Sequence, residues 1–228
     1  MIPWRTIDAA EIPGGGGRLR LMRRGDEFSI RLEGNELMNS RLSGSEEALA
    51  ALTCEPLEGR SGVCILIGGL GMGFTLRAAL AALAADAEVV VAELVPAVIA
   101  WAKGPMSEVF RGCVDDARVD LREADVGAVI TERTTRYDAI LLDVDNGPDG
   151  LTRQANDALY SANGLRAAYA ALRPGGVLAV WSSGPDPAFT KRLRNAGFVV
   201  EEKSARARGK SGGARHVIWL AARPPRAA

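Results

Sequence analysis

The sequence predicts an α/β fold with a seven-stranded, mostly parallel sheet that ends in an antiparallel hairpin. Three observations support this prediction. From Gly62 onward, short apolar runs alternate with helical segments. The first run, residues 63–67, stops abruptly in a glycine-rich turn from Gly68 to Gly73. The last two apolar runs are joined by a loop without a helical pattern, which indicates a hairpin.

Residues 1–58 have a different pattern and are expected to form a small N-terminal antiparallel β-meander with a linking helix. Two short runs between residues 18 and 33 alternate polar and apolar side chains, as strands with one buried face do. The run 45–52 is helical in composition, and Ser45 is its expected N-cap. Residues 59–228 are then expected to form the α/β domain.

Each element of the second domain follows from an apolar run or a helical period bounded by glycine, proline or polar residues. The expected strands are 62–67, 88–93, 118–122, 138–143, 176–182, 198–203 and 215–221, and the expected helices are 73–85, 95–103, 126–133, 156–172 and 187–195.

Charge and cysteine content exclude several classes of function. Lys+Arg and Asp+Glu both number 28 in 228 residues, so zero formal net charge argues for neither nucleic acid nor a membrane surface as a partner. The three cysteines have no metal-ligand spacing, so no metal is expected. There is no run of 18 apolar residues and no signal-peptide pattern at the start, which predicts a cytoplasmic protein.

The glycine-rich turn and the acidic residue after it suggest nucleoside binding. The glycines allow a sharp turn and let a ligand approach the backbone, although such turns also occur without a ligand. Glu93 ends the second strand, 20 residues after Gly73. A carboxylate at that strand tip can accept hydrogen bonds from both ribose hydroxyls, as in dinucleotide-binding folds. An exposed strand-end glutamate without a ligand is the alternative.

Two further strand ends carry carboxylates. Asp125 is placed either to accept a hydrogen bond from an adenine amine or to cap a helix. Asp143 and Asp145 follow the buried run 139–142, and carboxylates at the lip of a buried strand are costly unless they serve a cation or a proton transfer. Because ligands of open α/β sheets lie beyond the carboxyl ends of the strands, these groups are expected to converge on one site.

The chain resembles the spermidine synthase family, within the class I Rossmann-like fold of transferases that use S-adenosylmethionine (SAM). The resemblance runs from about residue 18 to 222 and includes the N-terminal meander. It rests on Glu93 as the ribose-binding acid, on 115–119 as the Asp-Pro-Arg-Val segment, on Ala124-Asp125 as the adenine pair, on 137–143 as the strand that ends in the catalytic aspartate, and on the later landmarks 159–161 and 172–176.

The resemblance implies a SAM-type donor, either SAM or decarboxylated SAM, a small-molecule acceptor, no metal and a homodimer. It makes Asp143 the catalytic residue and places Asp145 and Asn146 at the acceptor. The donor-binding residues that it implies are Gly68, Gly69, Leu70, Gly71, Gly73, Glu93, Leu94, Ala124, Asp125 and Asp143.

The departures from the family pattern bear on the reaction. Gly71 stands where the family's loop has an aspartate near the amino end of decarboxylated SAM, so a repulsion against the carboxylate of SAM is lost. Asn146 replaces the second aspartate of the acceptor motif, and the family's Tyr-His-Glu motif is not recognisable at 43–46. These departures favour a SAM-dependent methyltransferase that acts on a small polar or amine acceptor.

Two alternatives stay open. The first is a polyamine aminopropyltransferase that uses decarboxylated SAM, with Asp145 or Asp149 replacing the lost acids. The second is a non-catalytic nucleoside-binding module that keeps the fold. The direction of the Asp143 side chain distinguishes an enzyme from such a module. A carboxyl that faces a pocket favours the enzyme, and one held by backbone N–H groups favours the module.

Overall fold

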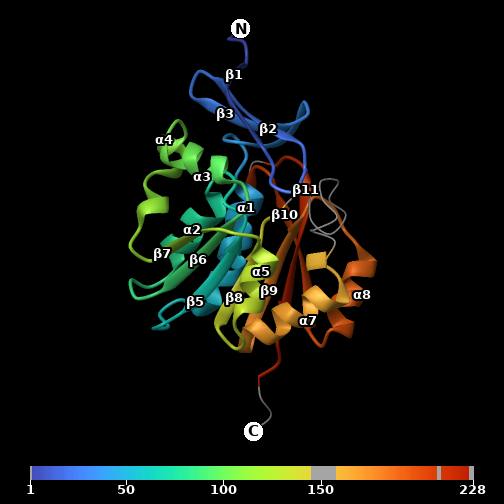
Figure 1. Ribbon diagram of the computed structural model, residues 1–228. Coiled ribbons are helices and arrows are strands. Elements are labelled where there is room, and N and C mark those ends of the chain that lie inside the picture. The colour runs from blue at the N-terminus through green and yellow to red at the C-terminus, as the bar shows by residue number, and fades with distance from the viewer. Residues whose placement is uncertain (1, 145–157, 210–211, 226–228) are drawn as a thin grey trace.

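The computed structural model describes residues 2–144, 158–209 and 212–225, which form two β-sheets with helices packed around the larger one (Figure 1). The N-terminal sheet contains β1 (Arg5–Glu11), β2 (Arg18–Arg24), β3 (Glu27–Leu32) and β4 (Asn35–Asn39). The larger sheet contains β5 (Cys64–Gly68), β6 (Glu88–Glu93), β7 (Val119–Glu123), β8 (Tyr137–Leu142), β9 (Leu172–Ser182), β10 (Val199–Arg206) and β11 (Arg215–Ala222).

The described helices lie between these strands in the chain. The α-helices are α1 (Gly44–Cys54), α2 (Phe74–Ala82), α3 (Pro96–Lys103), α4 (Ser107–Phe110), α5 (Val126–Glu132), α7 (Ala162–Ala171) and α8 (Pro187–Asn195), and the 3₁₀ turns are η1 (Glu55–Leu57) and η2 (Cys113–Asp115). No helix in the described ranges is both long and apolar enough to cross a lipid bilayer.

The larger sheet has seven strands, as predicted. Its strand order is β10-β11-β9-β8-β5-β6-β7. The five strands from β5 to β9 pair in parallel, whereas β11 pairs antiparallel with both β9 and β10. The order reverses at β5, which lies between β6 and β8, and in such sheets ligands bind beyond the carboxyl ends of the strands at the reversal. The predicted mostly parallel sheet with a C-terminal hairpin is confirmed.

Alternating side chains of the buried strands build one core on each face of this sheet. Ile65 and Ile67 face the core that also contains residues of α1, α2, α3 and the N-terminal sheet. Leu66 faces the core that contains residues of α5, α7 and α8. Because successive side chains of a strand point to opposite faces, a near-continuous apolar run is what a doubly covered strand requires.

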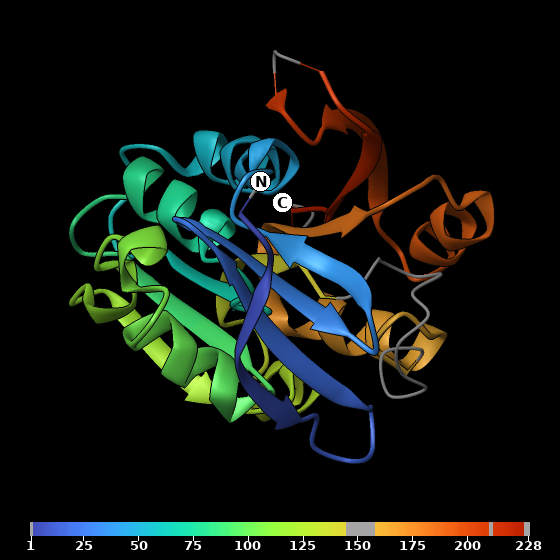
Figure 2. The ribbon, with the colours of Figure 1, turned by 90° about the horizontal axis from the view of Figure 1, so that it is seen from above.

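The N-terminal sheet is larger than the sequence predicts. Strand β1, residues 5–11, pairs antiparallel with β2 and was not expected, because five of its seven residues are exposed and give no burial pattern. Leu21 and Ile30 of the next two strands are fully buried and belong to the main core. Seen from above, this sheet lies across the top of the α/β domain (Figure 2).

Several boundaries differ from the predictions. Helix α7 begins at Ala162 and not at 156, because Ser161 caps it and its hydroxyl oxygen accepts from the Gly164 N–H. Helix α2 ends at Ala82 and not at 85, because Leu83 is extended. Strand β9 begins at Leu172, not at 176, because Leu172 pairs with Tyr137 and the N–H of Gly175, at φ +82°, donates to the Arg223 carbonyl. The predicted N-cap Ser45 is wrong. Ser43 occupies the cap position of α1, and the buried Ser45 hydroxyl donates to the Glu46 carboxyl instead.

Candidate active site

The glycine turn after β5 is held between the two neighbouring strand ends. The N–H of Gly69 donates to the Ala92 carbonyl over 2.9 Å, and the N–H of Asp143 donates to the Gly68 carbonyl over 3.0 Å. A Cβ on Gly69, which has φ +89°, would lie 2.4 Å from the Asp143 carbonyl oxygen. Glycine is therefore required at position 69, and the turn and Asp143 lie directly beside each other, as the sequence predicts.

Two of the predicted donor-binding glycines serve packing. A Cβ on Gly68 would lie 2.8 Å from the Val126 side chain, and one on Gly73 would lie 2.5 Å from the Phe110 ring. Neither residue lines the cavity beside Glu93, whereas Gly69 and Gly71 do. Close contacts thus require glycine at positions 68, 69 and 73, whereas only Gly69 and Gly71 border the cavity.

Glu93 is buried at the tip of β6, only 8% exposed. Its two carboxylate oxygens accept hydrogen bonds from the N–H of Leu70 over 2.9 Å and from the N–H of Val95 over 2.8 Å. Burial raises the pKa of the Glu93 carboxyl, and these backbone donors oppose the rise. The backbone N–H groups of Gly71 and Leu94 also lower the pKa of this carboxyl, so Glu93 joins the glycine turn to the loop after β6.

Asp125 caps a helix and also lines the cavity, so its position allows both roles that the sequence suggests. It is the N-cap of α5, where its carboxyl accepts a hydrogen bond from the Ala128 N–H over 3.1 Å. It also lines the cavity beside Glu93, together with the predicted residues Leu94 and Ala124. Capping fixes the position of the Asp125 carboxyl through one oxygen, and its other oxygen has acceptor sites left for a ligand amine.

These residues surround a cavity of about 130 Å³ between the two sheets. Glu93, Asp125 and Asp143 supply its carboxylates, and most of the remaining wall is apolar. The N-terminal sheet and the loops flanking it contribute Ile12, Leu19, Ile30, Leu37 and Met38, and the α/β domain contributes Gly69, Gly71, Ala92, Glu93, Leu94, Val95, Val98, Ala124, Asp125, Val126, Asp143 and Val144. A mostly apolar cleft with a few convergent polar groups is typical of a site for a small ligand.

A β-bulge in β4 turns the N-terminal sheet toward this cavity. Ile30 pairs with Met38 and Arg31 pairs with Glu36, so Leu37 is the extra residue. A bulge re-aims neighbouring side chains, and both Leu37 and Met38 line the cavity. The sequence did not reveal these two contributors, because strand alternation places consecutive residues on opposite faces.

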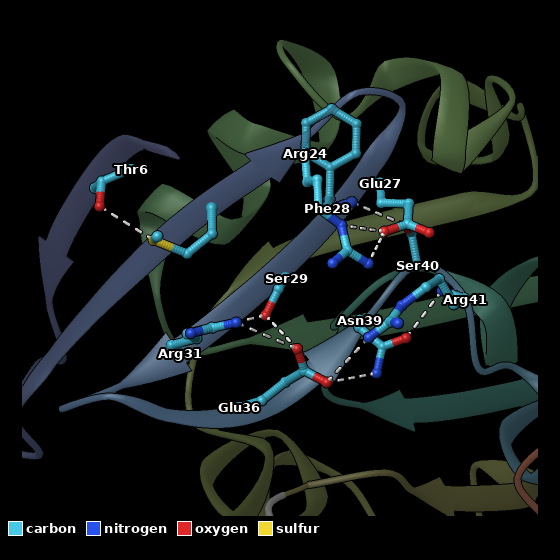
Figure 3. A network of polar contacts seen from close by, with 11 residues as sticks. Thr6, Arg24, Glu27, Phe28, Ser29, Arg31, Glu36, Asn39, Ser40 and Arg41 are labelled. Atoms are coloured by element: carbon cyan, nitrogen blue, oxygen red, sulfur yellow. Dashed lines mark hydrogen bonds and ion pairs between the residues drawn. The ribbon is translucent and has the colours of Figure 1, made fainter. Parts of the chain in front are cut away.

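A polar network fixes the position of the bulged strand (Figure 3). The Glu36 carboxylate accepts hydrogen bonds from the Ser29 hydroxyl and the Asn39 amide, each over 2.8 Å. Arg31 and Arg41 each lie 3.8 Å from the same carboxylate. Because Ser29 and Asn39 are buried, this network holds β3 and β4 in register and keeps Leu37 and Met38 over the cavity.

Asp143 follows β8 and lines both this cavity and a smaller one beyond Gly71. Its Oδ2 accepts a hydrogen bond from the Thr75 hydroxyl over 2.7 Å. Burial and the nearby charge of Glu46 raise the pKa of Asp143 to about 7, and the Thr75 hydrogen bond opposes the rise. The carboxyl is thus held by a side chain, with a pKa suited to proton transfer near neutral pH.

The raised pKa has a consequence for stability. The native state binds the Asp143 proton more tightly than the unfolded chain does, where the ordinary value is 3.8. This contribution is complete below pH 4 and is lost as the pH rises through about 7. We therefore expect Asp143→Asn to be more stable than the parent at pH 8 by about 1–2 kcal/mol, with the difference shrinking toward pH 4. Thermal unfolding at the two pH values measures it, and a difference independent of pH contradicts this account.

Some predicted residues cannot be placed. Asp145 and Asn146, the predicted acceptor residues, and Asp149, the alternative acid, lie outside the described residues. The site also contains residues that the sequence did not single out. Thr75, at the start of α2, and Glu46, in the first turn of α1, reach Asp143 only through the tertiary fold.

Comparison with known proteins gives results at the levels of sequence and fold. The sequence matches no family model. It is 31% identical over 121 residues to a polyamine aminopropyltransferase from Sulfolobus acidocaldarius, which is 53% of this chain but only 39% of that protein. The match therefore spans about two fifths of the length of this relative.

Two solved structures are similar over nearly the whole chain. A spermidine synthase in complex with the transition-state analogue AdoDATO has a TM-score of 0.77 at 20% identity and covers 96% of this chain and 74% of its own. The spermidine synthase from Thermotoga maritima has a TM-score of 0.74 at 18% identity, with 96% and 72% covered. At these identities the likeness shows the fold. The chain therefore has the fold of the spermidine synthases, and part of its sequence matches a polyamine aminopropyltransferase.

Proposed function

We propose that the chain transfers an aminopropyl group from decarboxylated SAM to a primary amine. One observation carries the proposal. The Asp143 carboxyl lies at the junction of two cavities, and the larger one is lined by the strand-end carboxylates Glu93 and Asp125. The sequence match to an aminopropyltransferase supports this reaction better than the methyl transfer that Gly71 alone suggests.

The reaction is a displacement at the carbon next to the sulfonium. The lone pair of the acceptor nitrogen forms the new C–N bond, the C–S bond breaks, and its electron pair stays on sulfur, which leaves as neutral methylthioadenosine. The ammonium form of the acceptor has no lone pair, so a proton must leave it first. Asp143, with a pKa of about 7, is suited to accept that proton near neutral pH.

The other residues would position the donor. Glu93 lines the cavity at the tip of β6, where ribose hydroxyls would donate to its carboxylate, and Asp125 can accept from the adenine amine while it caps α5. The apolar wall from the N-terminal sheet would cover the nucleoside and exclude water. Alignment of the two reactants supplies much of the rate enhancement in such displacements.

The direction of Asp143 argues against a purely non-catalytic module. Its described hydrogen bond comes from the Thr75 side chain, and the residue lines both cavities. A carboxyl that only terminates the strand would be held by backbone N–H groups. This arrangement supports an enzyme.

Methyl transfer from SAM is the second candidate. Gly71 favours it, because glycine has no acidic side chain to repel the carboxylate of SAM. Gly71 has φ +52°, and a Cβ there would lie 3.4 Å from the Met38 sulfur, so a short side chain is sterically tolerable. Aspartate and asparagine adopt this left-handed conformation more readily than most residues.

Donor choice can be measured by calorimetric titration with SAM and decarboxylated SAM side by side. We expect the parent to bind decarboxylated SAM at least as tightly as SAM. Gly71→Asp should shift the ratio of the two affinities toward the decarboxylated form by about 3–10-fold, because the new charge repels the carboxylate of SAM. Gly71→Asn has the same shape without the charge and is the control. A parent that binds only SAM would replace the proposal with methyl transfer.

A further inference from the structure

The smaller cavity beyond Gly71 has a volume of about 90 Å³. It lies next to the larger cavity that is lined by Glu93 and Asp125. The two cavities share Leu37, Met38, Gly71 and Asp143. A substituent on the 5′ side of a nucleoside bound between Glu93 and Asp125 can therefore extend past Gly71 into the smaller cavity. Its charge then has to suit the walls of that cavity.

Among the described residues, those walls carry two acids and no base. Glu46 and Asp143 supply two carboxyls, while the remaining lining comes from glycine and from aliphatic, sulfur-containing and aromatic side chains. Burial raises the pKa of Glu46, as it does that of Asp143, and the charge of Glu46 raises the pKa of Asp143 further. Two carboxylates in a small cavity repel each other, and a cation between them would relieve both the repulsion and the cost of burial.

Glu46 is held in place by its neighbour Ser45, which in turn contacts His216 from the C-terminal hairpin. The Ser45 hydroxyl donates to Glu46 Oε2 over 2.7 Å, and His216 Nδ1 lies 2.8 Å from the same hydroxyl oxygen. Because the serine has one proton and gives it to Glu46, its oxygen accepts from His216, so Nδ1 carries the histidine proton. Burial lowers the pKa of His216, which is consistent with this neutral form.

The C-terminal hairpin brings His216 to this position. The N–H of Gly44, at the start of α1, donates to the Ala207 carbonyl over 2.9 Å, which docks the turn after β10 against the helix. A Cβ on Gly44 would lie 2.1 Å from the Gly209 nitrogen, so the approach requires glycine. The side chains of Glu46 and His216 are thus fixed by contacts between segments far apart in the sequence.

Trp181 provides a second observation at the same cavity. Its side chain packs edge-on against His216, with ring centroids 4.7 Å apart. The residue is only 9% exposed, and its buried Nε1–H has no hydrogen-bond partner among the described residues. It lines the small cavity together with Glu46 and Asp143. An indole ring is also a favourable neighbour for an ammonium group.

We propose that Glu46 and Asp143 together bind a primary ammonium group in this cavity, with Glu46 positioned by Ser45 and His216. The inference rests on the proposed function and adds to it a specificity residue on α1. Gly71 leaves the loop without an acid, and Glu46 supplies one to the same space from the helix. The ammonium group has two possible sources, the aminopropyl tail of the donor or the acceptor amine.

Glu46→Gln tests the proposal, and Glu47→Gln is the matched control. Glu47 is the next residue of the same helical turn, its side chain is 47% exposed, and its carboxyl lies 3.8 Å from Arg77. Calorimetry would compare decarboxylated SAM with methylthioadenosine, which has no charged tail. If the donor's tail occupies the cavity, Glu46→Gln weakens decarboxylated SAM by about 5–30-fold and leaves methylthioadenosine within about 2-fold.

If the acceptor occupies the cavity, the same variant leaves both donor affinities unchanged and raises KM for 1,4-diaminobutane by about 5–30-fold instead. Either pattern supports the ammonium site. A Glu46→Gln protein that matches Glu47→Gln in all three measurements overturns it. Failure of the proposed function is separate, because then the unmodified chain itself forms no aminopropylated amine from decarboxylated SAM.

The positioning role of His216 and Ser45 has its own readout. His216→Asn keeps a donor near the position of Nδ1, whereas His216→Phe keeps the ring packing on Trp181 and removes the donor. We expect His216→Phe and Ser45→Ala to lose about 2–5-fold in the affected ammonium affinity, and His216→Asn to stay near the parent. Equal losses in the two His216 variants would mean that the histidine only packs.

Discussion

Replacing Asp143 by asparagine is expected to lower turnover by about 10²–10⁴-fold while nucleoside binding is retained. Asparagine keeps the shape of the side chain, including an oxygen that can accept the 2.7 Å hydrogen bond from Thr75. It cannot take a proton from the acceptor amine or balance its charge. Turnover with decarboxylated SAM and an amine, and the Kd for methylthioadenosine, should be measured on one preparation.

The pH dependence of the parent supports the same assignment. Because the carboxyl must be ionised to accept a proton, turnover should rise as the pH passes about 7, and this rise should be absent from the residual activity of Asp143→Asn. Asp115→Asn removes a surface carboxyl whose side chain is 71% exposed and serves as the control. Full turnover in the Asp143 variant would leave Asp143 as a strand terminator, and loss of nucleoside binding would make its role structural.

Glu93→Ala is expected to weaken methylthioadenosine binding by about 1.5–3 kcal/mol, the scale of lost hydrogen bonds to a charged group. Part of any loss could come from the glycine turn, since Glu93 also accepts from the Leu70 N–H. A ligand without the 2′-hydroxyl separates the two effects. If Glu93 bonds the ribose, the variant and the 2′-deoxy ligand should show non-additive losses, because each removes the same contact.

Glu123→Ala is the matched control for Glu93. Glu123 ends the neighbouring strand β7, directly opposite Glu93 in the sheet register, but it is exposed and is not among the described residues that line the cavity with Glu93. Its removal should leave the affinity unchanged. Additive losses for Glu93→Ala and the 2′-deoxy ligand would show that Glu93 acts only through the turn.

The strand-end residues could be predicted from the sequence for a physical reason. In a parallel sheet, residues that directly follow the strands must meet at one edge, so locating the strands also locates their ends. Glu93, Asp125, Asp143 and the glycine turn all reach one cavity by this rule. The bounds of β9 were harder to predict, because the pairing of Leu172 with Tyr137 depends on register and not on composition.

The remaining site residues depend on tertiary contacts that leave no local signal. Glu46 reads as an ordinary acid in the first turn of a helix, and only the docking of the hairpin on Gly44 turns it, through Ser45 and His216, toward Asp143. Ser45 was misassigned as an N-cap for the same reason, since its buried hydroxyl has a stronger partner in a charged carboxylate. Leu37 enters the site through a bulge that period-two alternation does not reveal.

The most direct test of the proposed function is product analysis by mass spectrometry. The unmodified chain would be incubated with 1,4-diaminobutane and either decarboxylated SAM or SAM. The proposal predicts release of methylthioadenosine with an equal amount of amine extended by one aminopropyl group, and only with decarboxylated SAM. S-adenosylhomocysteine and a methylated amine formed from SAM, with no product from decarboxylated SAM, would contradict it.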